Sequence, residues 1–299
     1  MNKKYLVGLL SLILLIFLIG NFGCSTMKSL VHKVGPGGAS LKKRVMFLPI
    51  IDLSNVEKGL TSYMTADLVE RFKKSPQLLL YEPSKIPGVL RKAPPGFGIA
   101  AQSELLKEAE DLDMNAVISG VLNPIEITTK KTGIWPFRTS CWSFKVSMVV
   151  NVIGAIRKTI LLSHLESRDV TFSLGEAQNQ SKKELADRAL KESLPRILKR
   201  QASSILENLE KGPWTGKILG VDNGKIKINA GKDIGLKPGH RFEVFARGES
   251  ISSIEGRAFF LLGKKIGKIK ASKVMEKHSL AVPVKEGQFL AGQIIRSRY

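Results

Sequence analysis

The residues of this chain that could do nucleophilic chemistry are one cysteine and one histidine. Cys141 could supply a thiolate and His164 a base, which is the pairing that thiol nucleophiles use. Both residues lie in segments that alternate like strands, and no third side chain that would orient the histidine is evident. The pattern therefore favours two structural residues, and it predicts no catalytic residue.

Metal, cofactor and glycosidase chemistry lack a defined set of residues as well. The two cysteines exclude a Cys-rich metal site, and the histidines are scattered as His32, His164, His240 and His278. Acid pairs such as Glu108 with Glu110 and Asp111 with Asp113 suit the solvated face of a helix, and nothing selects one pair for two-carboxylate catalysis. We expect no metal and no cofactor.

The glycine-rich segment AGKDIGLKPG (230–239) is the nearest approach to a phosphate-binding loop. Such a loop needs G-x-x-x-x-G-K-[ST] between a strand and a helix. Here Lys237-Pro238 stands after Gly235, and no helical pattern follows. The glycines are therefore predicted to occupy turns that require a positive φ.

Charge is the unusual feature of the composition. The chain has 299 residues, of which 47 are basic and 26 acidic, giving a net charge of +21. In a cytosolic protein this charge would indicate nucleic acid. The amino terminus argues otherwise, because Lys3 and Lys4 precede an apolar run from Tyr5 to Phe22, which is the order of an export signal. We therefore expect no nucleic-acid partner.

The end of this signal resembles that of bacterial lipoproteins, in which a cysteine after a small residue is acylated. Gly23 and Cys24 match that pattern, and Asn21 departs from it, because an aliphatic residue is preferred there. The resemblance implies that Cys24 is the lipidated first residue of the mature chain, and Ser25 favours the outer membrane. Two alternatives stay open: an uncleaved inner-membrane anchor of residues 5–22, and simple secretion.

The mature chain is predicted to hold a tether and two domains. Residues 24–43 read as a tether, and residues 44–212 as an α/β domain with a mixed sheet and flanking helices. The expected strands are 44–51, 78–82, 116–122, 143–152 and 159–172, and residues 83–100 form an irregular excursion. Three helices are expected. The first starts at Ser54 and the second spans 103–112. The third opens with the capping box Ser181–Glu184 and is kinked at Pro195.

Residues 213–299 change to short strands separated by glycine turns. Asn223-Gly224 lies between two alternating runs and predicts a hairpin. A small all-β barrel follows from this pattern.

The alternation in 143–174 suits either a globular sheet or a membrane hairpin. Lys145, Glu166, Arg168 and Asp169 interrupt the faces, which favours the globular sheet.

The barrel segment carries much of the positive charge. Residues 213–299 hold 17 basic and 7 acidic residues. A run of five lysines stands on one predicted strand pair. At a period of two, Lys264, Lys268 and Lys270 share a face that Ile266 interrupts. We interpret the run either as a solvated face or as a surface for lipopolysaccharide, peptidoglycan or an acidic protein. Its members are Lys264, Lys265, Lys268, Lys270 and Lys273.

Both domains resemble families of the bacterial envelope. Residues 44–122, with RVMFLPI, LLLYEPSKI and DMNAVISGVL, look like the amino-terminal domain of TolB-like proteins and curli-secretion (CsgG-like) lipoproteins. INAGKDIGLKPGHRFEVF, GKKIGKIKASKV and EGQFLAGQII are similar to the carboxyl-terminal domain of the flagellar assembly protein FlgT, from which Gln293 departs where an acid is usual. These resemblances imply no catalytic residue.

Taken together, the sequence predicts a non-catalytic, periplasm-facing lipoprotein of the outer membrane. It would support assembly or secretion of an envelope structure of the curli or flagellum type by binding other envelope proteins. One alternative is an oligomeric secretion pore of the curli-exporter type, and a second is an enzyme acting on cell-wall glycan.

Replacing Cys24 with alanine tests the lipid anchor. A diacylglyceryl group with an amide-linked acyl chain holds a protein firmly to a membrane, whereas one chain alone does so only marginally. We expect the Cys24→Ala chain to lose palmitate label, to keep its signal and to leave the outer-membrane fraction. Metabolic labelling and density-gradient separation measure this. Unlabelled wild-type protein, or a variant that fractionates like wild type, would favour the uncleaved anchor.

Overall fold

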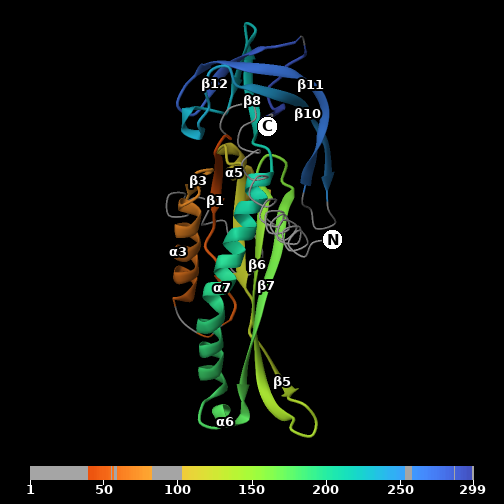
Figure 1. Ribbon diagram of the computed structural model, residues 1–299. Coiled ribbons are helices and arrows are strands. Elements are labelled where there is room, and N and C mark those ends of the chain that lie inside the picture. The colour runs from red at the N-terminus through yellow and green to blue at the C-terminus, as the bar shows by residue number, and fades with distance from the viewer. Residues whose placement is uncertain are drawn as a thin grey trace, which may run out of the picture. The chain divides into compact units, whose positions relative to one another are not determined.

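The computed structural model describes residues 40–54, 56, 59–82, 103–252, 258–285 and 287–297 (Figure 1). Residues 41–298 form one compact unit. The predicted signal, Cys24, most of the tether and the 83–100 excursion lie outside the described residues. Within the described ranges, none of the helices combines the length and the apolar character needed to cross a bilayer.

The first part of this unit is a mixed sheet, as predicted, and it has seven strands where five were expected. Its core order is β3-β1-β4-β6-β5, with β2 also paired to β4 and β7 to β6. β1 runs parallel to β3 and β4, whereas β6 runs antiparallel to β4, β5 and β7. The strands are β1 (Lys43–Phe47), β2 (Ile51–Asp52), β3 (Leu78–Tyr81), β4 (Ala116–Leu122), β5 (Glu126–Thr132), β6 (Thr139–Gly154) and β7 (Ile160–Ser173).

Helices cover both faces of this sheet. Alternate residues of β1 and β4 enter two different clusters, because successive side chains of a strand point to opposite faces. Helices α3 (Leu60–Lys73) and α7 (Lys182–Lys211) pack on one face, and α5 (Ser103–Asp111) packs on the other. The short α6 (Leu174–Ala177) joins β7 to α7. The predicted capping box of Ser181 and Glu184 is confirmed, and α7 continues through Pro195.

The start of the sheet differs from the prediction in two places. The expected strand 44–51 is divided, because Pro49 has no N–H to donate and the chain leaves the ladder after Phe47. The expected helix at Ser54 begins at Leu60, after Gly59, whose φ of 89° suits glycine.

Strand β5 was not predicted. All seven of its residues are exposed, so its sequence EITTKKT carries no alternation of apolar and polar residues. It forms because β6 is long enough to pair with β4 over one half and with β5 over the other.

The β6–β7 hairpin is a globular sheet, as favoured. The alternating residues of β6 are buried in the same core as α7, and they are Phe144, Val146, Met148, Val150 and Val152.

The second sheet is a closed barrel with the order β10-β11-β12-β9-β8-β13. Asn223 and Gly224 both have positive φ, 47° and 74°, which is the two-residue turn that the sequence predicts between β8 and β9. Inward side chains such as Phe242, Val244 and Ile269 form a separate core. The elements are β8 (Thr215–Asp222), β9 (Lys225–Ile228), the 3₁₀ turn η3 (Lys232–Ile234), β10 (Arg241–Ser252), β11 (Ala258–Val274), β12 (Ser279–Pro283) and β13 (Ile294–Ser297).

A buried arginine joins the two sheets. Arg44 on β1 is 3% exposed, and its guanidinium binds both carboxylate oxygens of Asp233 at 2.8 and 2.9 Å. The same group donates to the carbonyls of Asn229 and Lys277. Asn115 adds a second polar link, because it accepts from the Arg44 N–H and donates to the Thr215 carbonyl.

Arg44→Met tests how much this joint stabilises the fold. Removing one partner of a buried ion pair leaves an unpaired charge, so the free energy of unfolding should fall by about 3–5 kcal/mol. Chemical denaturation measures it. Lys74→Met removes an exposed pair with Glu70, which water screens, so its effect on the free energy of unfolding should be far smaller. Equal effects of the two variants would contradict the role assigned to Arg44.

Candidate functional site

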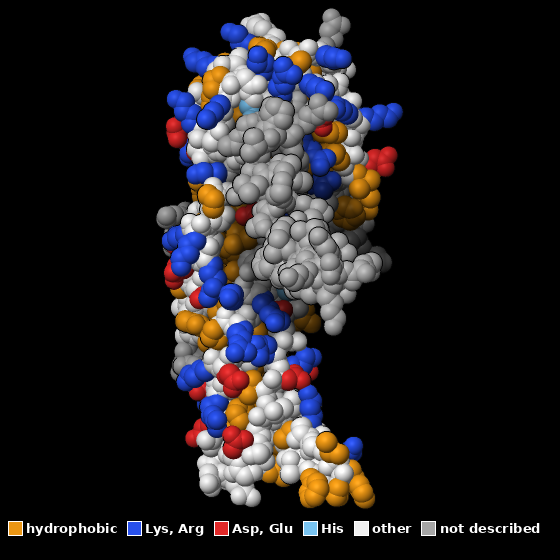
Figure 2. Space-filling view, viewed as in Figure 1, with side chains coloured by type: hydrophobic (Ala, Val, Ile, Leu, Met, Phe, Trp, Pro, Cys, Tyr) orange, Lys and Arg blue, Asp and Glu red, His pale blue; other side chains and the backbone are white. Residues whose placement is uncertain are grey.

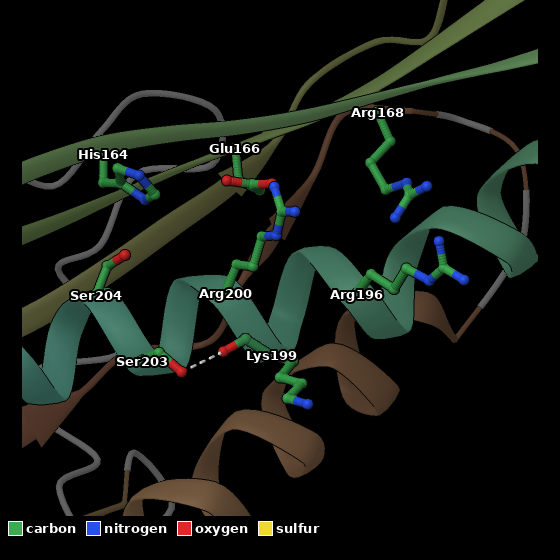
Figure 3. Close-up of a pocket in the computed structure, with 8 residues that line it drawn as sticks. All are labelled: His164, Glu166, Arg168, Arg196, Lys199, Arg200, Ser203 and Ser204. Carbon is green, nitrogen blue, oxygen red and sulfur yellow. Dashed lines mark hydrogen bonds and ion pairs between the residues drawn. The ribbon is translucent and has the colours of Figure 1, made fainter. Parts of the chain in front are cut away.

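The candidate site is a groove of about 560 Å³ between strand β7 and helix α7 (Figure 3). Strand β7 contributes three of its lining residues and helix α7 the other five. They are His164, Glu166 and Arg168 on β7, and Arg196, Lys199, Arg200, Ser203 and Ser204 on α7.

Two periodicities bring these side chains together. On β7, His164, Glu166 and Arg168 alternate onto the face that continues with the buried Val170 and Phe172. On α7, the cationic residues and Ser203 recur at intervals of three and four, so they lie along one flank of the helix. The buried stripe of α7 fixes that flank beside the edge strand.

Gln201 sets the spacing between helix and strand. It is fully buried, and its amide nitrogen donates to the carbonyls of Met148 at 2.7 Å and His164 at 3.2 Å. Its amide oxygen lies 3.1 Å from Nδ1 of His164. Buried polar groups are costly unless they are satisfied, so these contacts hold α7 at one position against β6 and β7.

The groove is cationic. Arg200 and Glu166 form an ion pair at 2.7 Å, in which the Glu166 side chain is only 11% exposed. In Figure 3 the side chains of Arg168 and Arg196 extend from strand and helix toward the same space. Among the described residues, no acid forms an ion pair with the guanidinium group of Arg168 or of Arg196. Lys and Arg side chains also gather over the middle of α7 in Figure 2.

This arrangement is suited to binding an anion. Guanidinium groups match phosphate and carboxylate oxygens with two parallel hydrogen bonds, and two converging groups repel each other until an anion lies between them. Ser203 donates its hydroxyl to the Lys199 carbonyl. Within the described ranges, no group of three or more His, Cys, Asp or Glu side chains could hold a metal ion.

Cys141 and His164 are not brought together. Cys141 lies opposite Ser173 and His164 opposite Val150, so nine residues of β7 separate them, or roughly 30 Å at the usual rise per residue. The thiol of Cys141 instead donates to the Lys130 carbonyl. The interpretation of two structural residues agrees with this placement.

The acids of α5 and its following turn are less solvated than predicted. Asp113 accepts from the Asn229 amide at 2.9 Å and lies 4.0 Å from Lys217. Glu110 lies 4.0 Å from Arg247. These residues contact the barrel, which no periodicity within the helix could indicate.

The five predicted lysines lie on β11. An extra residue, Ile266, breaks the period of two, and it packs against the barrel core. Lys265 therefore pairs with Glu243, the register partner of Lys268, and these two lysines share a face. Burial lowers the pKa of the nearby His240, so this histidine adds no charge at neutral pH. Whether Lys264, Lys265, Lys268, Lys270 and Lys273 bind an anionic partner stays a prediction.

Sequence reasoning did not single out the groove. The sequence indicates His164 only as a possible base for Cys141 and Glu166 only as a charge that interrupts a hairpin, and its patterns single out none of the α7 cations. The available signal was the spacing of Arg196, Lys199 and Arg200 opposite the apolar stripe.

Comparison with known proteins gives partial structural similarity. No family model matches the chain, and no curated protein matches it. The hypothetical protein CT253 from Chlamydia trachomatis is 17% identical, with 56% of this chain and 96% of that chain covered and a TM-score of 0.32. Lipoprotein GNA1162 from Neisseria meningitidis is 13% identical, with 57% and 99% covered and a TM-score of 0.32. The LpoB C-terminal domain from Salmonella enterica is 7% identical, with 47% and 90% covered and a TM-score of 0.28.

These similarities are weak and carry no argument about partners. The resemblance to CsgG-like proteins and to FlgT stays a prediction.

Titration with inorganic phosphate tests the groove as an anion site. We expect the Nε–Hε resonances of Arg168 and Arg196 to shift, while that of the paired Arg44 stays in place. A charged hydrogen bond contributes about 1.5–3 kcal/mol, so Arg168→Gln with Arg196→Gln should weaken binding by at least about tenfold. Lys225→Gln, at an exposed position of β9, is the control. Equal shifts at all arginines would contradict a defined site.

Proposed function

We propose that this protein is a non-catalytic lipoprotein of the bacterial envelope that faces the periplasm and binds an anionic partner in the β7–α7 groove. The observation that carries the proposal is the convergence of Arg168 and Arg196 on one space, where none of the described acids forms an ion pair with either of them. The export signal ending at Cys24 supports the location, and Ser25 supports the outer membrane.

The partner is proposed to be an envelope protein with an acidic or phosphorylated surface. Exported proteins do not meet chromosomal nucleic acid, so the positive charge must serve partners in the envelope. Lipopolysaccharide phosphates and peptidoglycan carboxylates share the same chemistry, and binding of either in place of a protein is an outcome of the experiment below. Through such binding the protein would support assembly or secretion of a curli- or flagellum-type structure, as the family resemblance implies.

An enzymatic role has less support from the groove. Glu166 is the one acid among the described residues that line it, and its ion pair with Arg200 keeps it from acting as a free acid or base. Glycosidases need two carboxyl groups about 5–9.5 Å apart. A secretion pore is also less supported, because the apolar face of the β6–β7 hairpin is buried against α7.

Purified mature protein tests the non-catalytic role. We expect no clearing of a peptidoglycan zymogram and no release of phosphate from nucleotides, together with retention of an envelope protein on immobilised wild type. Retention should fall by at least about tenfold for Arg168→Glu with Arg196→Glu, because two attractive charges become repulsive.

The control is Arg71→Glu, at a partly exposed ion pair on α3. Hydrolysis of glycan or nucleotide by the wild type would contradict the proposal. Retention of lipopolysaccharide or peptidoglycan alone would replace the protein partner with that polymer.

A further inference from the structure

An apolar loop stands at the free end of the β5–β6 hairpin (Figure 1). Its side chains Ile134, Trp135 and Phe137 are 85, 78 and 84% exposed. In Figure 2 these residues form the hydrophobic group at the lower end of the view. Large apolar side chains are common singly on a surface, but three within four residues at one tip form a patch that indicates a binding surface.

The loop is built to hold these side chains outward. The ladder of β5 and β6 is regular up to the pair Thr132 and Thr139, and the Phe137 N–H donates to the Ile134 carbonyl at 2.7 Å. Gly133 has a φ of 103°, and a Cβ there would lie 2.6 Å from the Phe137 carbonyl oxygen. A tight turn of this kind keeps the three side chains away from the protein core.

The surroundings of the tip are basic and polar. Lys131 and Arg138 flank it, and both are exposed. Lys130 pairs with Asp169, whereas the segment 127–165 contains no acid. Every residue of β5 is exposed, and its threonines and lysines make the strand that leads to the tip largely hydrophilic.

This combination matches a lipid surface. Tryptophan is favoured at the boundary between hydrocarbon and headgroups, where its ring is buried and its N–H stays near water. Lysine and arginine beside such a group are attracted to anionic headgroups by about 1 kcal/mol each. A second copy of this chain is a poorer match, because Lys131 and Arg138 of the two tips would repel each other.

We propose that Ile134, Trp135 and Phe137 insert into the interfacial layer of a bilayer that contains anionic phospholipid, with Lys131 and Arg138 contacting the headgroups. This contact is independent of the groove and of acylation at Cys24. Where Cys24 is acylated, the tip supplies a second membrane contact, and two contacts give firmer attachment than one.

Vesicle flotation tests the inference with residues 24–299 carrying Cys24→Ser, a chain that contains the whole compact unit and no acyl group. The probes are vesicles of phosphatidylcholine with and without phosphatidylglycerol. We expect wild type to float with the anionic vesicles, and the triple variant Ile134→Ser, Trp135→Ser and Phe137→Ser to bind at least about tenfold more weakly, given the apolar area removed from water by insertion.

Matched variants separate the two contributions. Leu165→Ser changes a residue that is 56% exposed on β7 and should float like wild type. Lys131→Glu with Arg138→Glu should weaken binding only where phosphatidylglycerol is present, and added salt should reduce the difference. Trp135 emission should shift to shorter wavelength with vesicles, and Trp135→Phe should abolish that shift.

Circular dichroism and thermal unfolding establish that the triple variant is folded, which is expected because the three side chains are 78–85% exposed. Equal flotation of wild type and triple variant would overturn the proposal. So would a wild type that ignores vesicles but forms oligomers that the triple variant does not, because the tip would then dock on a second copy.

Discussion

The buried guanidinium of Arg44 constrains how the mixed sheet and the barrel pack together. A charge at 3% exposure is tolerated only where its hydrogen bonds are satisfied, so Asp233 and the carbonyls of Asn229 and Lys277 must all reach β1. Asn229 and Asp233 lie in the connection from β9 to β10, and Lys277 lies in the turn between β11 and β12. The mixed sheet and the barrel are therefore joined by directional bonds in addition to apolar packing.

A second buried polar residue links this framework to the groove. Gln201 satisfies the carbonyls of Met148 and His164, so the helix that carries Arg196 cannot slide relative to the strand that carries Arg168 without breaking them. Rigid placement matters because two like charges held close together bind an anion more tightly than two that can move apart. The same strand pair, β6 and β7, extends past the core, where β6 continues to the exposed hairpin tip.

Local patterns predicted most of the elements and few of the contacts between them. The strand at 116–122, the alternation in β6, the capping box at Ser181 and the Asn223-Gly224 turn are properties of neighbouring residues, and each is confirmed. Strand β5 is held by its pairing with β6 and not by burial of its own side chains, so its polar sequence gave no indication of it. The groove combines residues of one strand and one helix, and in the sequence each set looks like a solvated face. Arg44 looks like any basic residue at the start of a strand.

The central claim is that the β7–α7 groove binds an anionic partner in the envelope, and site-specific photocrosslinking in living cells tests it most directly. A photoreactive amino acid at Ser203, which is exposed at the groove, should give a light-dependent adduct with one envelope component. The account predicts that this adduct disappears when Arg168 and Arg196 are replaced by glutamate, and that the same probe at exposed Lys225 gives none. The same adduct from both positions, or its persistence after the charge reversal, would contradict the account.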